Sequence, residues 1–197
     1  MIKRPLKIGL TGGIGSGKTT ISHIFQSLGI EVFNSDQYGK KAIEENKTVI
    51  KKIHQEFGED IITNGHINKK NLSKIVFQDI TKLRKLNNII HPIVIQDFNK
   101  WYSKKTNHYI IKESALLFES KTFHNLDAII LIKAPVELRI NRVYQRDNRS
   151  RSEILSIIKN QLKTKDIKEH TDYIINNNEK TLLTPKVIQL HKQLMNL

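Results

Sequence analysis

The chain has 197 residues, of which 38% are hydrophobic and 26% are charged, and these values fit one compact globular domain, or a core with a small attached lobe. It contains no cysteine, which excludes disulfides, thiolate chemistry and cysteine-ligated metal sites. The formal net charge of +14 favours anionic ligands, and because the lysines are spread along the chain, we expect small molecules such as nucleotides and no nucleic-acid partner.

Neither a membrane span nor a targeting segment is predicted. No stretch approaches the roughly 18 apolar residues that a span needs. The basic start Met1–Leu10 carries only a very short apolar run before a glycine-rich loop, which is not typical of a signal peptide. We therefore expect a cytoplasmic protein without a membrane partner, either monomeric or weakly self-associating.

The first predicted elements form a strand, a loop, a helix and a second strand. Leu6–Leu10 is a short apolar run and reads as a buried strand. Lys18–Leu28 has apolar residues at helical spacing, and Gly29 is a typical helix stop. Ile30–Asn34 is the second strand. This order predicts a βαβ start with a parallel sheet.

The middle of the chain, from Asp36 to about Thr106, is predicted to be helical, with a loop at Phe57–Asn68. Strand patterns are absent from it. The expected helices are Tyr38–Glu45, Thr48–Phe57, Leu72–Phe77 and a long segment Ile80–Lys104. Pro92 should kink or divide the long segment, because proline lacks the N–H donor and clashes with the preceding turn.

Strands return in the last part of the chain. Tyr109–Glu113 and Ala128–Lys133 are apolar enough for a sheet buried on both faces, and Tyr173–Asn177 is a short fifth strand. Helices are predicted at Val136–Arg146 and Glu153–Lys163, around a polar interruption at Asp147–Ser152. Thr184 is expected to cap, and Pro185 to start, a last helix ending at Leu194.

The glycine-rich stretch Thr11–Thr20 lies between the first strand and the first helix, and five of the seven arginines lie between Arg139 and Arg151. With these two features, the elements predict an α/β fold of the P-loop NTPase type, with a parallel five-stranded sheet flanked by helices, a helical insertion and an arginine-rich lid. We expect the nucleotide-binding core at residues 1–35, 107–141 and 164–197, the acceptor-binding insertion at 36–106, and the lid at 142–163.

The stretch Thr11–Thr20, TGGIGSGKTT, holds four of the nine glycines of the chain. Gly12, Gly17, Lys18 and Thr19 match the P-loop pattern G-x-x-x-x-G-K-[ST], between a predicted strand and a predicted helix. Such a loop turns backbone N–H groups toward phosphate oxygens, at the positive end of the helix. We therefore expect ATP on Gly12, Gly13, Ile14, Gly15, Ser16, Gly17, Lys18, Thr19 and Thr20, with Lys18 on the β- and γ-phosphates and the Thr19 hydroxyl on Mg²⁺.

The reaction is predicted to be phosphoryl transfer to a small molecule. A GTPase would need an N-K-x-D motif, and the stretches at Asn46 and Asn68 lack its aspartate. Asp36 follows the second strand at the carboxyl edge of the sheet and is the candidate base, although it could instead only cap the next helix. Five of the seven arginines lie between Arg139 and Arg151, which indicates phosphate recognition by a lid, or else a solvated helix face.

Together, these stretches resemble the dephospho-CoA kinase family over nearly the whole chain. The motifs that carry the resemblance are IGLTGGIGSGKTT (Ile8–Thr20), LGIEVFNSDQYGKK (Leu28–Lys41), IIHP (Ile89–Pro92), SALLFE (Ser114–Glu119), NRVYQRDNRSR (Asn141–Arg151) and DYIINNN (Asp172–Asn178). The resemblance implies ATP-dependent phosphorylation of the ribose 3′-hydroxyl of dephospho-CoA, giving coenzyme A and ADP.

The resemblance also implies roles for individual residues. Asp36 corresponds to the catalytic base, and Lys18, Arg142 and Arg146 to further catalytic residues, the two arginines contacting phosphates of ATP, with Arg151 a further candidate. His91, Leu117 and Glu119 join Asp36 as acceptor-binding positions, although His91 and Glu119 have equally good structural roles. Gln161 and Lys165 align with polar positions that face the nucleotide.

Four positions depart from the pattern of the family. Asn34 replaces an aspartate, Lys40 an arginine, Ala115 a proline and Glu179 a glycine. None of them lies in the P-loop. Two alternatives stay open at this point: another P-loop kinase, acting on a nucleoside, a nucleotide or shikimate, and a basic nucleic-acid-binding protein with a regulatory P-loop.

Overall fold

A parallel sheet of five strands forms the centre of the first of two units in the computed structural model, which describes residues 4–63, 65–120, 122–161 and 167–197. The strands are β1 (Leu6–Gly12), β2 (Val32–Asn34), β5 (Tyr109–Glu113), β6 (Ala128–Lys133) and β7 (Tyr173–Asn176). Their order is β2-β5-β1-β6-β7 and every pairing is parallel. The predicted parallel five-stranded sheet is confirmed.

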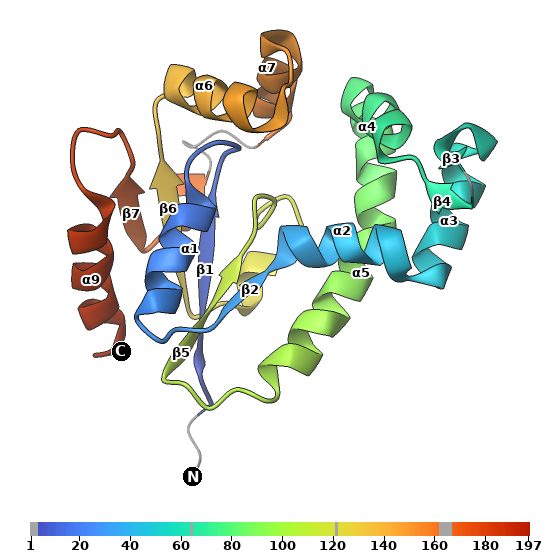
Figure 1. Ribbon diagram of the computed structural model, residues 1–197. Helices are drawn as coiled ribbons and strands as arrows, with labels where there is room; N and C mark the ends of the chain where they lie inside the picture. Colours follow the sequence, from blue (N-terminus) through green and yellow to red (C-terminus); the bar gives the residue numbers. More distant parts are fainter. Residues whose placement is uncertain (1–3, 64, 121, 162–166) are drawn as a thin grey trace. The chain divides into compact units, whose positions relative to one another are not determined.

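The apolar strands place β1 at the middle of this sheet (Figure 1). Ile8 of β1 pairs with Ile111 of β5 on one side and Ala128 of β6 on the other. All five residues of β5 are buried, because strands of a parallel sheet are covered on both faces.

The first unit comprises residues 1–34 and 104–197. Within the described residues, its helices include α1 (Lys18–Ser27), α6 (Val136–Asp147), α7 (Arg151–Asn160) and α9 (Leu183–Leu194), with the 3₁₀ turn η2 (Thr122–Asn125). The helices α1 and α9 contact each other and pack on the core cluster around Ile8, Leu10 and Phe25. A second cluster, around Leu117 and Leu131, also includes Ile129, Phe118 and Ile167.

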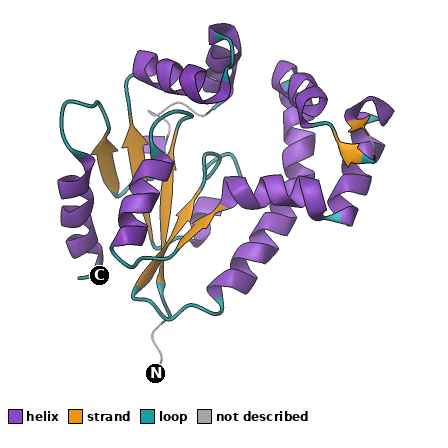
Figure 2. Cartoon of the chain, in the orientation of Figure 1, coloured by secondary structure: helices purple, strands orange, loops and turns teal. Residues whose placement is uncertain are grey.

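The second unit comprises residues 35–103 and is mainly helical (Figure 2). Its helices are α2 (Ser35–Glu45), α3 (Lys47–Phe57), α4 (Lys69–Gln78) and α5 (Ile80–Tyr102). The polar residues Asn46, Asn68 and Asp79 cap α3, α4 and α5 by accepting backbone N–H groups.

Two local expectations were wrong. The stretch Phe57–Asn68 is not only a loop, since it holds the 3₁₀ turn η1 (Glu59–Ile61) and the antiparallel strands β3 (Ile62–Thr63) and β4 (His66–Ile67). Division of the long helix at Pro92 is also excluded, because α5 continues through it, while the alternative expectation of a kink stays a prediction. Thr184 lies inside the first turn of α9, whose N-cap is Leu182 without a side-chain bond.

None of the helices in the described ranges is long and apolar enough to span a membrane.

Candidate active site

The glycine-rich loop between β1 and α1 has backbone geometry that only glycine adopts easily. Gly15 and Gly17 have φ values of 73° and 97°, in the left-handed region. A Cβ at Gly15 would lie 2.5 Å from the carbonyl oxygen of Arg139, and one at Gly17 would lie 2.2 Å from Asn177 Nδ2. Glycine is therefore required at both positions, by conformation and by the close approach of neighbouring segments.

Lys18 begins α1 directly after this loop. Its side chain is 8% exposed, and its Nζ donates to the carbonyl oxygen of Gly12 at 3.0 Å. Gly17 is the N-cap of α1 and provides no side-chain bond, so the first amides of the helix lack a capping oxygen from it. A lysine ammonium and a helix N-terminus thus meet in one loop, which is the arrangement that binds phosphate.

Glu113, the last residue of β5, is a buried carboxylate that the sequence reasoning missed. It is 2% exposed. Its Oε1 accepts from the Thr19 hydroxyl at 3.3 Å, and its Oε2 accepts from the Ser22 hydroxyl at 2.7 Å. The strand register sets Glu113 beside Leu10 of β1 and Asn34 of β2. The hydroxyl predicted to bind Mg²⁺ is therefore held by an acidic side chain from the neighbouring strand.

An oxygen-rich pair of this kind fits a magnesium ion. Mg²⁺ in kinase sites takes one or two protein oxygens and completes its shell with water and substrate phosphates. Thr19 and Glu113 supply such oxygens beside the loop. Over the described ranges, no cluster of three or more His, Cys, Asp or Glu side chains could hold a metal by itself, so the phosphates of the nucleotide would have to complete the site.

Arg139, on α6, holds the outer side of the loop at Ile14. Its Nε donates to the carbonyl oxygen of Ile14 at 2.8 Å, and its terminal Nη2 donates to Gln161 Oε1 at 3.3 Å. Gln161 Oε1 also accepts from the Ile14 amide at 2.9 Å. Burial lowers the pKa of Arg139. Both backbone groups of Ile14 are therefore held by one arginine and one glutamine.

Arg142, one turn further along α6, contacts the next residue of the loop. Its Nη1 donates to the carbonyl oxygen of Gly15 at 3.1 Å. Its Nη2 donates to Asn177 Oδ1 at 3.1 Å and to Glu179 Oε1 at 2.8 Å, and its Nε also donates to that carboxylate. Asn177 in turn donates from Nδ2 to the carbonyl oxygen of Ser16 at 2.8 Å.

The remaining arginines of the cluster pair with acidic neighbours. Arg146 donates to Asp147 at 2.7 and 2.9 Å, and this hydrogen-bonded carboxylate raises the pKa of Arg146. Arg149 lies 3.8 Å from the same aspartate. Arg151 makes a bidentate pair with Glu137 at 2.7 and 2.8 Å. Of the five arginines, Arg139 and Arg142 thus contact the loop, and the other three contact only acidic partners in the bonds named here.

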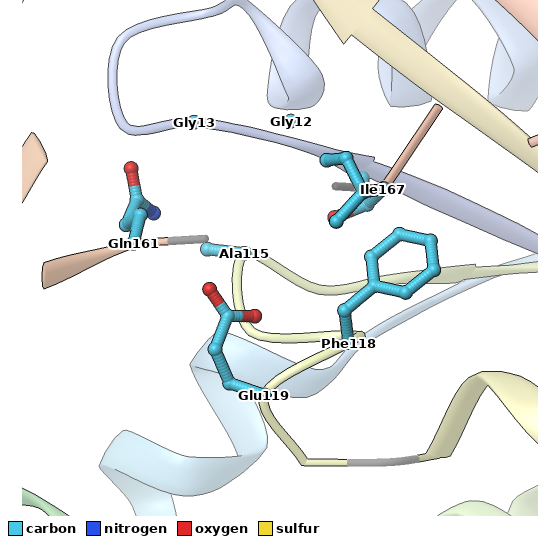
Figure 3. A pocket seen from close by; sticks show the side chains of 8 residues that line it. Gly12, Gly13, Ala115, Phe118, Glu119, Gln161 and Ile167 are labelled. Atoms are coloured by element: carbon cyan, nitrogen blue, oxygen red, sulfur yellow. The ribbon is translucent and has the colours of Figure 1, made fainter. Parts of the chain in front are cut away.

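A pocket lies beside the loop at the carboxyl ends of β1 and β5 (Figure 3). Gly12 and Gly13 form one side of it, and Phe118 and Ile167 an apolar side. The carboxylate of Glu119 and the amide of Gln161 point into the same space. Other lining residues are Thr11 and Ala115. The site can therefore take a ligand with both apolar and polar groups next to the loop.

The predicted acceptor residues fall in different surroundings. Glu119 lines the pocket, whereas Leu117 is fully buried in the core cluster below it and offers no surface to a ligand in this structure. Asp36 is the second residue of α2, two positions beyond the end of β2. His91 lies inside α5. Asp36 and His91 belong to the second unit, and Lys165 lies outside the described residues.

One of the four departures from the family pattern has a structural explanation. Glu179 has a left-handed backbone conformation that glycine adopts easily, with a φ of 62°, and its carboxylate pairs with Arg142. Ala115 lines the pocket. Nothing in the structure explains Lys40, which is exposed on α2.

Comparison with known proteins identifies relatives over nearly the whole chain. The family described as dephospho-CoA kinase matches residues 6–182. A dephospho-CoA kinase of Bacteroides fragilis is 36% identical over 186 residues, 94% of this chain and 91% of the relative. One of Fusobacterium nucleatum is 41% identical over 172 residues, 87% and 89% of the two chains. The structure of dephospho-CoA kinase from Campylobacter jejuni superposes with a TM-score of 0.69 at 25% identity, covering 96% of this chain and 97% of that one.

Proposed function

The chain belongs to the dephospho-CoA kinase family, and we propose that it performs the reaction of this family with the P-loop as donor site and Asp36 as base. The reaction is the final step of coenzyme A biosynthesis, in which ATP phosphorylates dephospho-CoA. Family membership decides between this reaction and the two alternatives left open by the sequence, another P-loop kinase and a regulatory nucleic-acid-binding protein.

The geometry of the loop is the main support for the proposal that ATP binds there. Lys18 and the N-terminus of α1 meet there, and Gly15 and Gly17 have the left-handed φ values of a tightly turned loop. Positive charge and N–H donors are thus gathered where the β- and γ-phosphates of ATP would bind. The Nζ of Lys18, which contacts Gly12 in this structure, would exchange this carbonyl for phosphate oxygens.

Magnesium fits beside this loop on the Thr19 hydroxyl. Bound there, the ion would neutralise charge on the β- and γ-phosphates. Thr19 would provide one oxygen ligand, and Glu113 would orient that hydroxyl through the 3.3 Å hydrogen bond and through the negative charge of its carboxylate. Ser22 holds the other oxygen of Glu113 and so fixes the orientation of the carboxylate.

The acceptor is proposed to react through its ribose 3′-hydroxyl. Asp36 takes the proton of this hydroxyl as its oxygen attacks the γ-phosphorus, and the bond from that phosphorus to the bridging oxygen of ADP breaks. Glu119 supports acceptor binding, since its carboxylate points into the pocket beside Gly13. His91 and Leu117 stay weaker candidates, and the role of Leu117 would require it to leave the core cluster.

Arg142 and Arg146 are proposed to contact the phosphates during transfer. In this structure Arg142 is paired with Glu179 and Arg146 with Asp147. Guanidinium groups bind phosphate bidentately, so each would exchange its carboxylate partner for the nucleotide as α6 and α7 close over the loop.

The experiment that tests this function measures ADP release from Mg-ATP in parallel reactions with dephospho-CoA, adenosine, AMP and shikimate. Strong stimulation by dephospho-CoA alone, with coenzyme A identified as product by mass spectrometry, is the expected result. Turnover on another acceptor, without stimulation by dephospho-CoA, would overturn the assignment of the acceptor. The variant Lys18→Met serves as the control for ATP hydrolysis by a contaminant, because it removes the ammonium from the loop.

A further inference from the structure

Three successive carbonyl groups of the P-loop are each held by a side chain from outside the loop. Arg139 Nε donates to the oxygen of Ile14 at 2.8 Å, and Asn177 Nδ2 donates to that of Ser16 at 2.8 Å. Between them, the oxygen of Gly15 accepts from Arg142 at 3.1 Å. The donors come from two separate elements of the first unit, α6 and the segment after β7.

Holding a carbonyl outward determines where the next amide points. In a trans peptide the C=O and the following N–H are antiparallel. A donor on the oxygen of Ile14 therefore turns the amide of Gly15 to the opposite side, and one on the oxygen of Ser16 does the same for the amide of Gly17. No residue in the described part of the chain accepts from these two amides, whereas the amide of Ser16 closes a turn on Gly13 at 3.1 Å.

The side chain of Arg139 is well placed to hold the backbone of Ile14. Its Nε and Nη2 lie in one plane, and they meet the oxygen of Ile14 and the oxygen of Gln161. The amide of Ile14 donates to the same Gln161 oxygen at 2.9 Å. The three hydrogen bonds join Arg139, Gln161 and Ile14 in a closed ring, so the backbone of Ile14 cannot rotate without breaking at least one of them. The backbone of α6 also approaches closely, since a Cβ at Gly15 would lie 2.5 Å from the oxygen of Arg139.

We propose that Arg139 is a positioning residue of the donor site, which fixes the P-loop in its phosphate-binding shape by holding Ile14 together with Gln161. It acts through the loop and not by contact with ATP, in contrast to Arg142 and Arg146. A loop that is already fixed loses less conformational freedom when phosphate binds. The proposal rests on the proposed function only in taking the P-loop as the site of ATP.

The test compares Arg139→Met and Arg139→Lys with Arg4→Met, whose arginine is 72% exposed and lies 3.6 Å from Asp127 far from the loop along β1. Isothermal titration with Mg-ADP and with inorganic tripolyphosphate measures the affinity of each variant. We expect the affinity of both Arg139 variants to fall about tenfold or more for each of the two ligands. The two factors should be similar, because both ligands bind through phosphates and the substitutions disturb the loop that receives them. Arg4→Met should bind as the wild type does.

The lysine variant distinguishes shape from charge. Lysine keeps the positive charge but cannot make both in-plane bonds, so wild-type affinity in Arg139→Lys would overturn the proposal in favour of a long-range electrostatic effect. Equal affinities in all variants, with only a lower melting temperature for Arg139→Met, would overturn it in favour of a purely structural role. Addition of guanidinium at low millimolar concentration should partly restore tripolyphosphate binding to Arg139→Met. Failure of the wild type itself to bind Mg-ADP would refute the proposed function instead.

Discussion

Asp36 is the residue on which the proposed chemistry depends most directly. The change Asp36→Asn keeps the size and hydrogen-bonding shape of the side chain but cannot take a proton. We expect turnover of dephospho-CoA to fall by roughly 100-fold or more, while the affinity for Mg-ADP stays within about twofold. The matched control is Asp60→Asn, at an exposed position of η1. A variant with wild-type turnover would exclude Asp36 as the base.

Glu113 offers a second change, directed at the metal. In Glu113→Gln the side chain keeps an acceptor oxygen for the hydroxyl of Thr19 or Ser22 but loses its charge. We expect the Mg²⁺ concentration that gives half-maximal rate to rise about tenfold, the range typical of groups that orient a metal ligand. Steady-state rates over a Mg²⁺ series, with the exposed Glu169→Gln as control, measure this shift. An unchanged Mg²⁺ requirement would contradict the orienting role.

The P-loop and Glu113 show which parts of a site a sequence pattern can predict and which it cannot. The P-loop is contiguous, and its glycines and lysine have fixed spacing, so its place and ligand class follow from the sequence. Glu113 reaches Thr19 only because β5 lies beside β1 in the sheet, and such a neighbour relation has no fixed spacing along the chain. The available clue was a carboxylate at the end of a strand that begins with a tyrosine and two isoleucines. Arg139 lies inside the predicted arginine cluster, but the sequence does not indicate that it bonds to Ile14, which is 125 residues away along the chain.

Helix α7, in the segment predicted to be a lid, is stabilised at its first turn by side-chain capping. Ser150 accepts from the amide of Glu153 at 3.3 Å, and the carboxylate of Glu153 accepts from the amide of Ser150 at 2.8 Å, a reciprocal capping box. The change Ser150→Ala should lower the free energy of unfolding by about 1 kcal/mol, measured by urea denaturation. Ser156→Ala, inside the same helix, should not destabilise it, because alanine has the higher helix propensity. Equal stability of the two variants would contradict this account.

The helices and strands that were predicted correctly have long, regular patterns. The core strands and α1, α3 and α6 follow from apolar periodicity and from stops such as Gly29. The hairpin of β3 and β4 was missed because strands of two residues show no alternation. Thr184 was expected to cap α9 because threonine precedes proline there, but α9 begins two residues before Pro185, at Leu183, whose side chain packs against the core cluster.

The stability of the whole molecule should depend on pH through Lys112. This lysine is 5% exposed within β5, and burial, followed by repulsion from Lys7, lowers its pKa from 10.5 to about 8. Below pH 8 both the folded and the unfolded states carry the proton, and the fold bears the full cost of a buried charge. Between pH 8 and 10.5 the unfolded state binds more protons than the native state. Stability therefore rises with pH across this window.

The change Lys112→Met tests this linkage. It should raise the free energy of unfolding at pH 7 by about 1–3 kcal/mol, and the gain should shrink as the pH approaches 10.5. Urea denaturation of both proteins at pH 7, 8.5 and 10 measures the difference. Lys52→Met, at an exposed position of α3, is the control and should be neutral at every pH. A gain for Lys112→Met that does not depend on pH would point to packing alone.

The position of the second unit in the chain has a consequence for the order in which the molecule folds. Strands β2 and β5 are neighbours in the sheet and pair over three residues, yet all of residues 35–103 lies between them in the chain. Joining them early would close a very long loop for few hydrogen bonds, at an entropic cost that grows with loop length. The helices of the second unit contact one another over shorter separations and can form first. Strand β2, at the edge of the sheet, is therefore expected to join last, so Asn34 is expected to take its place beside Glu113 only at the end of folding.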